Sequence, residues 1–431
     1  MNTIKMLQQF TDRNRQKSLE EFFEALKNMR FQKDGPATYK PRPIEFPAFH
    51  PQLPPPLLAK LLDLATESKM YDIGRSLLFS DDWEGPLIHP GLHCDWIVGA
   101  SIVRFGTMAG ENDLVLKIVN QNGTITTDSA THRMSHDLLT ALFCSQIKLH
   151  RWNSIRGMQE YVLANPGYRL LPEMLSTFAA ELLRSSSKPP DSEEDAPPLA
   201  DNVACHAFTD FLFRWEHLIF HDLSNELHSI LAILSTVSTE WKLYCAQFLS
   251  FSITQGIKLH VNDFNRILSG IADVYGSSKA RETVQMWCYT APEVLSVYTA
   301  PGGLPGMPQY RVDAGQEYRS KPPNIVITHP SGEASLVIKN RMRFNRQTIR
   351  IIVDRVKEEE VERRQGEGEG EGLDDVQQRQ EQLRETLRWA LGFLCRLGAD
   401  WDDVVGELGE FAELAGVEGL ARPSPYPRAA V

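Results

Sequence analysis

Apolar residues recur at steps of three and four residues along most of the chain between positions 57 and 287. This spacing places apolar side chains on one face of an α-helix, so it predicts amphipathic helices rather than strands. The predicted helices cover 57–67, 71–79, 95–105, 113–119, 133–149, 152–163, 171–183, 203–220, 225–236 and 241–253, and two more lie between 261 and 287. The pattern therefore predicts an all-α fold.

The predicted helices form pairs, and the pairs recur at a regular interval. Their first helices start near residues 57, 95, 133, 171, 225 and 261. The interval is about 38 residues when the polar stretch 185–200, SSSKPPDSEEDAPPLA, is treated as an insert. A sustained period of this size is typical of helix-pair repeats, in which each pair buries its apolar stripe against its neighbours. We therefore predict a right-handed α-solenoid of degenerate helix-turn-helix repeats.

The stretch 256–287 shows one such pair most clearly. Its first helix carries an apolar stripe, and its second carries a shorter one. Gly276 interrupts the pattern between them, because glycine adopts the left-handed conformation that ends many helices. The two stripes consist of Val261, Phe264, Ile267, Leu268, Ile271 and Val274, and then Ala280, Val284 and Trp287. We expect Phe264 and Trp287 to be buried, because neither helix is long enough to be stable in water by itself.

This stretch resembles one repeat of the pentatricopeptide-repeat (PPR) family. The resemblance rests on Gly256-Ile257-Lys258, on Phe264-Asn265 and on Lys279-Ala280-Arg281-Glu282. Leu259-His260 stands where the family has Pro-Asp, so the match is partial. A second PPR-like helix start covers 344–352. The resemblance implies a non-catalytic protein that binds single-stranded RNA in transcript stability, processing or translation, in most cases within mitochondria.

The resemblance also implies which residues would read the RNA. In the family, a side chain near the start of each first helix binds one base, together with the residue that precedes the next repeat. Carried over to this chain, the first role falls to Asn265, to Arg350 and, more loosely, to His136. The second role falls to His260 and Asn345. We expect Asn265 to be an exposed polar residue that faces the groove.

The charge of the chain favours a different function, a solenoid scaffold that binds a protein partner in its groove. The net charge is −11, and the acidic excess is concentrated in 191–195 and 358–375. The remainder is close to neutral and has no basic excess, although RNA affinity depends on Lys and Arg that neutralise phosphates. Both hypotheses remain open at this point. The first 17 residues carry Lys5, Arg13, Arg15 and Lys17 against Asp12, which resembles a mitochondrial presequence weakly. The favoured interpretation of this stretch is an ordinary first helix that continues into 19–29.

Residues that could support catalysis or bind a metal do not form a recognisable set in the sequence. The pairs His89/His93, His132/His136 and His217/His221 share a helical spacing, but no Cys or carboxylate completes a tetrahedral site. No nucleophile–base motif and no phosphate-binding glycine loop are present. The six cysteines are scattered, as in proteins of reducing compartments. We therefore expect no catalytic residues, no cofactor, no small-molecule substrate and no membrane span.

Composition divides the chain into five parts. Residues 1–56 form an N-terminal helix and a Pro-rich extended segment, and 57–300 form the solenoid with a disordered insert at 185–200. Residues 301–357 contain a loop and further PPR-like helices, and 324–328 could be a short strand or a buried helical turn. The Gly/Glu-rich stretch 358–375 is predicted to be a disordered spacer. Residues 376–431 form a last helix pair and a tail.

Overall fold

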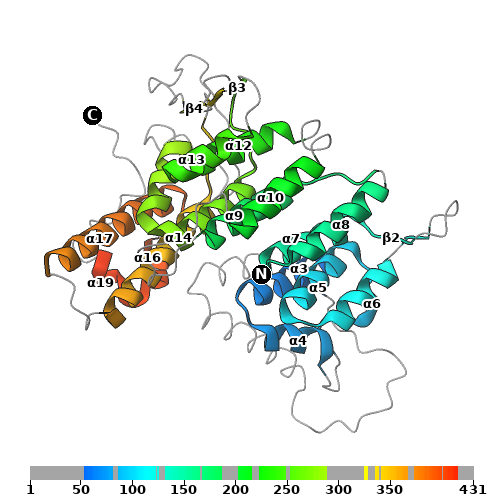
Figure 1. Cartoon of the computed structure of the whole chain (residues 1–431). Coiled ribbons are helices and arrows are strands. Elements are labelled where there is room, and N and C mark those ends of the chain that lie inside the picture. The colour runs from blue at the N-terminus through cyan, green and yellow to red at the C-terminus, as the bar shows by residue number, and fades with distance from the viewer. Residues whose placement is uncertain are drawn as a thin grey trace, which may run out of the picture. The chain divides into compact units, whose positions relative to one another are not determined.

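The computed structural model describes most of the predicted helical region and much of the C-terminal third. The described residues are 53–80, 86–122, 124–125, 132–165, 167–186, 202–215, 223–248, 253–288, 325–328, 335–338, 341–366, 373–399 and 401–415. They are mostly helical, which confirms the all-α class (Figure 1). The predicted helix at the N-terminus and the insert 185–200, apart from its first residues, lie outside them. The chain divides into two compact units, Met1–Leu149 and His150–Val431.

The first unit is built around α5 (Trp96–Ala109). Asp95 caps its start by accepting from the N–H groups of Ile97 and Val98, and Gly110 ends it at φ 79°. α5 packs on α3 (Pro55–Glu67), α6 (Asn112–Asn122) and α7 (His136–Lys148). The unit also contains α4 (Tyr71–Phe79), the turn η1 (Pro90–Leu92) and the two-residue strands β1 (Thr124–Ile125) and β2 (His132–Arg133). Its helices match the predicted ones to within a few residues.

In the second unit, α12 (Ser224–Ser235) is buried along most of its length, from Leu227 to Ser235. A helix that is buried on every side lies in the middle of a core. α13 (Thr239–Ala246) and α9 (Pro172–Ser185) pack on it. α10 (Val203–Arg214) lies against α9 and α8 (Trp152–Ala164), and Phe178, Phe208 and Phe211 fill the space between them.

α14 (Val261–Trp287) consists of two helices joined at Gly276, which has φ 84° and ψ 173°. Contacts with α16 (Arg346–Gly366) show its path. Asn265 bonds to Thr348 near the start of α16, Ser277 bonds to Glu359 near its end, and the carbonyl of Trp287 returns to the N–H of Met342. The two halves are therefore antiparallel, as the sequence predicts. Phe264 and Trp287 are fully buried, which confirms that prediction too.

The first half of α14 lies directly between α9 and α16 (Figure 1). Ser176 bonds to Asp263 and Arg184 to Asp273, so α9 and α14 advance in the same direction. Gly270 allows this contact, because a Cβ there would lie 2.9 Å from the carbonyl oxygen of Ala180. α12 and α13 intervene in the sequence between α9 and α14, but they do not lie between them in space.

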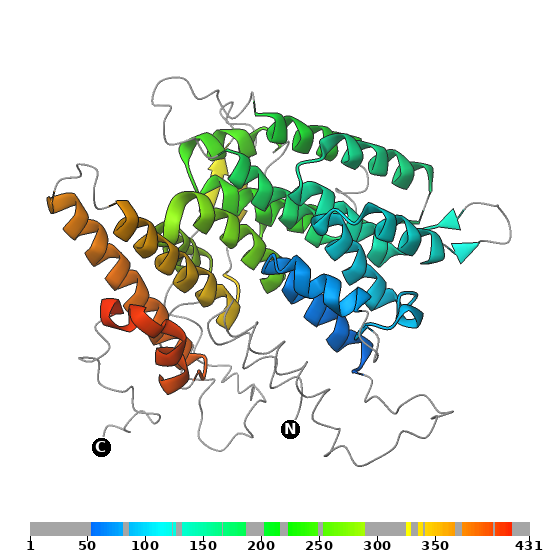
Figure 2. The same ribbon diagram turned by 90° about the horizontal axis from the view of Figure 1, so that it is seen from below.

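The C-terminal helices form a separate core on the other side of α16. α17 (Leu373–Arg396) is antiparallel to α16, because Arg346 at the start of α16 donates to the carbonyl of Leu397 (Figure 2). α18 (Trp401–Leu408), η4 (Gly409–Phe411) and α19 (Ala412–Ala415) cover α17. Ile349, Val353, Leu387, Leu391 and Leu394 are among the buried residues of this core. This arrangement agrees with the predicted last helix pair.

Three short strands accompany the helices of the second unit. β5 (Ser335–Ile338) is central, parallel to β3 (Ile253–Gln255) and antiparallel to β4 (Ile325–Thr328). Residues 324–328, predicted to be either a short strand or a buried helical turn, contain the strand β4. The helix predicted over 241–253 is too long, because α13 ends at Ala246 and Ile253 begins β3. The pairing of β3 depends on a strand more than 80 positions later, which is a contact that local pattern does not report.

The prediction of a disordered spacer over 358–375 is wrong for much of its length. α16 continues to Gly366 and α17 begins at Leu373. Acidic and basic side chains alternate along this part of α16 and pair with one another: Arg355 with Glu358 and Glu362, and Glu360 with Arg363 and Arg364. Pairs spaced three and four residues apart stabilise a helix, so high charge here does not mean disorder.

Candidate functional site

The predicted RNA-reading residue Asn265 is buried, with 7% of its surface exposed. Its Oδ1 accepts from the Thr348 hydroxyl at 2.7 Å, and its Nδ2 donates to Asn345 Oδ1 at 3.2 Å. The expectation that Asn265 is exposed is therefore wrong. The first half of α14 packs on α9 with one face and on α16 with another, so a residue outside the apolar stripe is also covered.

Asn345 does come close to Asn265, but it caps a helix. Its Oδ1 accepts from the N–H of Thr348 at 3.0 Å, and its own N–H donates to the Thr348 hydroxyl at 3.2 Å. This reciprocal pair satisfies donors at the start of α16 that have no partner within the helix. Asn265, Asn345 and Thr348 thus form one polar cluster that joins α14 to α16.

The other predicted residues lie apart from this cluster. His260 is exposed and caps α14, where its Nδ1 accepts from the N–H of Asn262 at 3.3 Å. Arg350 is buried on α16. His136 opens α7 in the first unit, and its carbonyl accepts from the Thr140 hydroxyl. The structure therefore brings together two of the five predicted residues.

Ion pairs join α9 to the first half of α14. Arg266 bonds to Glu173 and to Asp263, each at 2.7 Å, and Arg184 bonds to Asp273 at 2.7 Å and to Glu181. Burial raises the pKa of Asp263, although Arg266 and the hydroxyl of Ser176 oppose the shift. Such partly buried pairs fix how two helices pack more than they add stability.

A second polar contact fixes the turn inside α14. The carboxylate of Glu359 accepts from the N–H of Ser277 at 2.7 Å and from its hydroxyl at 2.6 Å. Arg355, one turn earlier on α16, lies 3.3 Å from the same carboxylate. Glu359 therefore caps the second half of α14 from another helix, in a manner that local sequence does not reveal.

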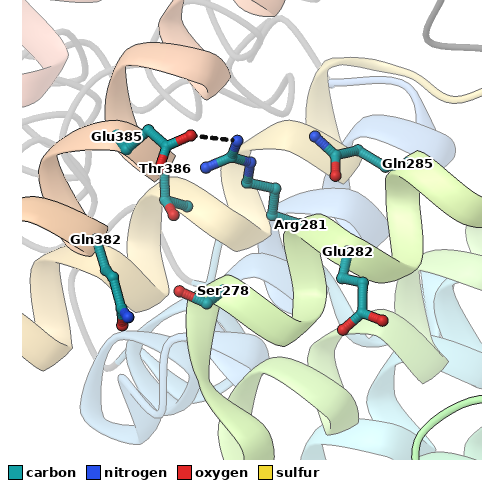
Figure 3. Close-up of a pocket in the computed structure, with 7 residues that line it drawn as sticks. All are labelled: Ser278, Arg281, Glu282, Gln285, Gln382, Glu385 and Thr386. Atoms are coloured by element: carbon teal, nitrogen blue, oxygen red, sulfur yellow. Dashed lines mark hydrogen bonds and ion pairs between the residues drawn. The ribbon is translucent and has the colours of Figure 1, made fainter. Parts of the chain in front are cut away.

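A small groove opens between the second half of α14 and α17, and we call it the α14–α17 groove (Figure 3). Its volume is about 180 Å³. Arg281 donates to Glu385 across it at 2.8 Å, and its guanidinium lies 5.8 Å from the centre of the Trp389 ring. The lining residues are Ser278, Arg281, Glu282 and Gln285 from α14 and Gln382, Glu385 and Thr386 from α17.

Sequence reasoning missed this groove. Arg281 was assigned to a repeat motif, and its partner Glu385 lies 104 positions later. The sequence signal for the second wall of the groove is the amphipathic pattern of 383–397. This pattern predicts a helix there, but it does not predict that the helix packs against 277–287.

Burial disfavours the thiolate form of three cysteines. Burial raises the pKa of Cys205 to about 11, and it raises the pKa of Cys245 and Cys288 as well. A thiol with a raised pKa carries almost no thiolate at neutral pH, so these residues pack as small apolar groups. Within the described ranges, His, Cys, Asp and Glu form no group of three that could hold a metal ion.

The described helices also include none that is long and apolar enough to cross a lipid bilayer. No protein-family model matches the chain, and no curated protein is similar to it.

Proposed function

We propose that this chain is a non-catalytic helical scaffold that binds a protein partner. The position of Asn265 carries this proposal. The side chain that the PPR resemblance assigns to base reading is buried, and its oxygen and nitrogen already have partners in Thr348 of α16 and in Asn345, which caps α16. It could reach a base only if α14 separated from α16.

The ion pairs of the second unit support the same function. RNA binding depends on cations that are available to phosphate groups. Many arginines of this unit instead pair with carboxylates of the chain itself, which leaves little local positive charge for a polyanion. These arginines are Arg184, Arg214, Arg266, Arg355, Arg363, Arg364 and Arg384.

The proposal includes a right-handed solenoid as the framework. In such arrays the first helices of successive pairs stack side by side, and their exposed face binds a ligand. The parallel packing of α9, the first half of α14 and α16 supports this stacking. The position of α12, buried and outside this row, departs from a simple succession of pairs.

RNA binding is the alternative function. The observation that favours it is His260, which is exposed at the start of α14 in the role that the family gives to the residue before a repeat. An exposed imidazole can stack on a base or bond to its edge.

Gel-shift titration of the full chain with a pool of single-stranded RNAs at low salt separates the two functions. The scaffold proposal predicts no shift, because low salt favours any phosphate contact that the surface can make. It also predicts that the complex isolated from cells keeps its size in gel filtration after ribonuclease treatment. A salt-sensitive shift that His260→Ala weakens would overturn the proposal, as would a complex that nuclease reduces to the free chain.

A further inference from the structure

The α14–α17 groove contains an arginine with unused hydrogen-bond donors. A guanidinium has five N–H groups. Among the described residues, Arg281 has one hydrogen-bond partner, Glu385, and its Nε is buried without an acceptor. The ring of Trp389 lies beside the guanidinium and restricts its orientation, so its planar edge is prepared for a ligand. Such preorganisation reduces the entropy lost on binding.

The side chains around Arg281 complement a peptide. Gln285 and Gln382 lie on opposite walls, one on each helix (Figure 3). Each primary amide both donates and accepts, so together they suit the N–H and C=O groups of a passing backbone. The hydroxyls of Ser278 and Thr386 also line the groove. The remaining lining residue, Glu282, pairs with Lys279 at 2.8 Å, so its charge is compensated on α14 itself.

We propose that the α14–α17 groove binds an acidic side chain, Asp or Glu, of a protein partner, and that Arg281 receives its carboxylate. This inference rests on the proposed scaffold function and names its recognition chemistry. Arginine binds carboxylates with two parallel N–H···O bonds, a geometry that the single bond to Glu385 does not use. Arginine and tryptophan are also the residues that most often dominate protein interfaces.

Glu385 competes with the incoming carboxylate in this scheme. Its side chain is 66% exposed and makes one bond to Arg281, whose side chain is 20% exposed. An exposed pair of this kind is weak, so the ligand displaces Glu385 at small cost. Removal of the Glu385 charge should therefore strengthen binding. A groove that selected a basic side chain would show the opposite effect.

The test starts from a phage-displayed library of short random peptides, which is selected against the full chain. We expect the enriched peptides to share Asp or Glu at one position. The best of them, synthesised with an amidated C-terminus, is then titrated by fluorescence polarisation. Arg281→Gln should weaken its affinity by about tenfold or more, and Arg281→Lys should not restore it, because lysine lacks the planar fork. Glu385→Gln should tighten binding by about two- to fivefold.

Matched variants control for general electrostatics and for folding. Arg156→Gln removes the same charge at an exposed position on α8 and should leave the affinity unchanged. Gln382→Ala, on the opposite wall, should weaken binding without touching Arg281. The inference would be overturned if the selection enriched basic peptides or enriched none, or if binding required a free C-terminal carboxylate. It would also be overturned if Glu385→Gln weakened binding, or if Arg156→Gln weakened it as much as Arg281→Gln. A labelled single-stranded RNA titrated in parallel tests the scaffold function separately, since RNA binding would contradict that function and peptide results would not.

Discussion

At the scale of single residues, burial changes the role of Asn265. An exposed amide near a helix start is free to bind a ligand, whereas the same amide between two packed helices serves the fold. Asn265 lies 80 positions before Asn345 and 83 before Thr348, and it bonds to them only because α14 and α16 lie side by side. The RNA-reading role of Asn265 stays a prediction, and the structure gives its side chain a structural task.

We predict that Asn265→Ala destabilises the protein by about 1–3 kcal/mol, because the Thr348 hydroxyl and the Asn345 amide lose a partner in a buried site. An exposed Asn265, as expected from the sequence, would contribute little to folding. Thermal unfolding of the purified variant measures the change. Asn262→Ala, on the exposed side of the same helix, should stay within about 0.5 kcal/mol of wild type. Equal stability of the two variants would contradict the buried cluster.

A buried histidine gives a prediction about pH. Burial lowers the pKa of His228 on α12 below its ordinary value of 6.5. The folded protein therefore keeps the ring neutral where the unfolded chain protonates it. This contribution to stability is complete above the unfolded pKa and is lost as pH falls below it. The melting temperature of His228→Gln should fall less steeply than that of wild type between about pH 7 and about pH 5.

The readout for His228 is the slope of melting temperature against pH, since the substitution itself can shift the baseline. His206→Gln, at an exposed position on α10, serves as the control and should leave the slope unchanged. A slope in His228→Gln equal to that of wild type would show that His228 does not titrate between the folded and unfolded states.

At the scale of helices and strands, α14 depends on close packing and on a cap from another helix. α9 and α14 approach through Gly270, and Glu359 fixes the turn at Ser277. Both features set the direction of α14 relative to its neighbours, and through them the position of the α14–α17 groove.

Gly270→Ala tests the helix contact. Its Cβ would lie 2.9 Å from the carbonyl oxygen and 3.0 Å from the Cα of Ala180, which is backbone that cannot turn aside. We expect a loss of about 1–3 kcal/mol in the free energy of unfolding, measured with urea. Gly157→Ala in α8 has open space around its Cβ and should instead gain about 0.5–1 kcal/mol. Stabilisation by both substitutions would refute the close approach.

Glu359→Ala tests the cap. The variant leaves the N–H and hydroxyl of Ser277 without their acceptor, so we expect a loss of about 1–3 kcal/mol in the same assay. The adjacent Glu358 provides the control, because its side chain is exposed and its pair with Arg355 is on the surface of α16. Glu358→Ala should cost no more than about 1 kcal/mol. Similar losses in the two variants would indicate a general effect of charge on α16.

At the scale of the whole molecule, the compartment is the remaining expectation that the PPR resemblance implies. We predict that the chain, fused to a fluorescent protein at its C-terminus, is found in mitochondria when expressed in its own cells. The basic residues of the presequence-like start should be required, because transit peptides are rich in positive charge and poor in acids. The variant with Lys5, Arg13, Arg15 and Lys17 all replaced by Gln should stay outside. Wild-type fluorescence spread through the cytosol would contradict this prediction.

The sequence by itself determined the helical class, the positions of most helices of 57–287 to within a few residues, the break at Gly276 and the burial of Phe264 and Trp287. Each follows from apolar spacing or from the backbone freedom of glycine, which are local properties. It misassigned Asn265, the charged end of α16 and residues 253–255, because their partners lie on distant segments. The tertiary structure alone decided that α14 packs between α9 and α16 and that Arg281 faces Glu385. The reason is physical: a stripe of apolar residues specifies that a helix must be covered, but not by which helix, and polar contacts between helices depend on that choice.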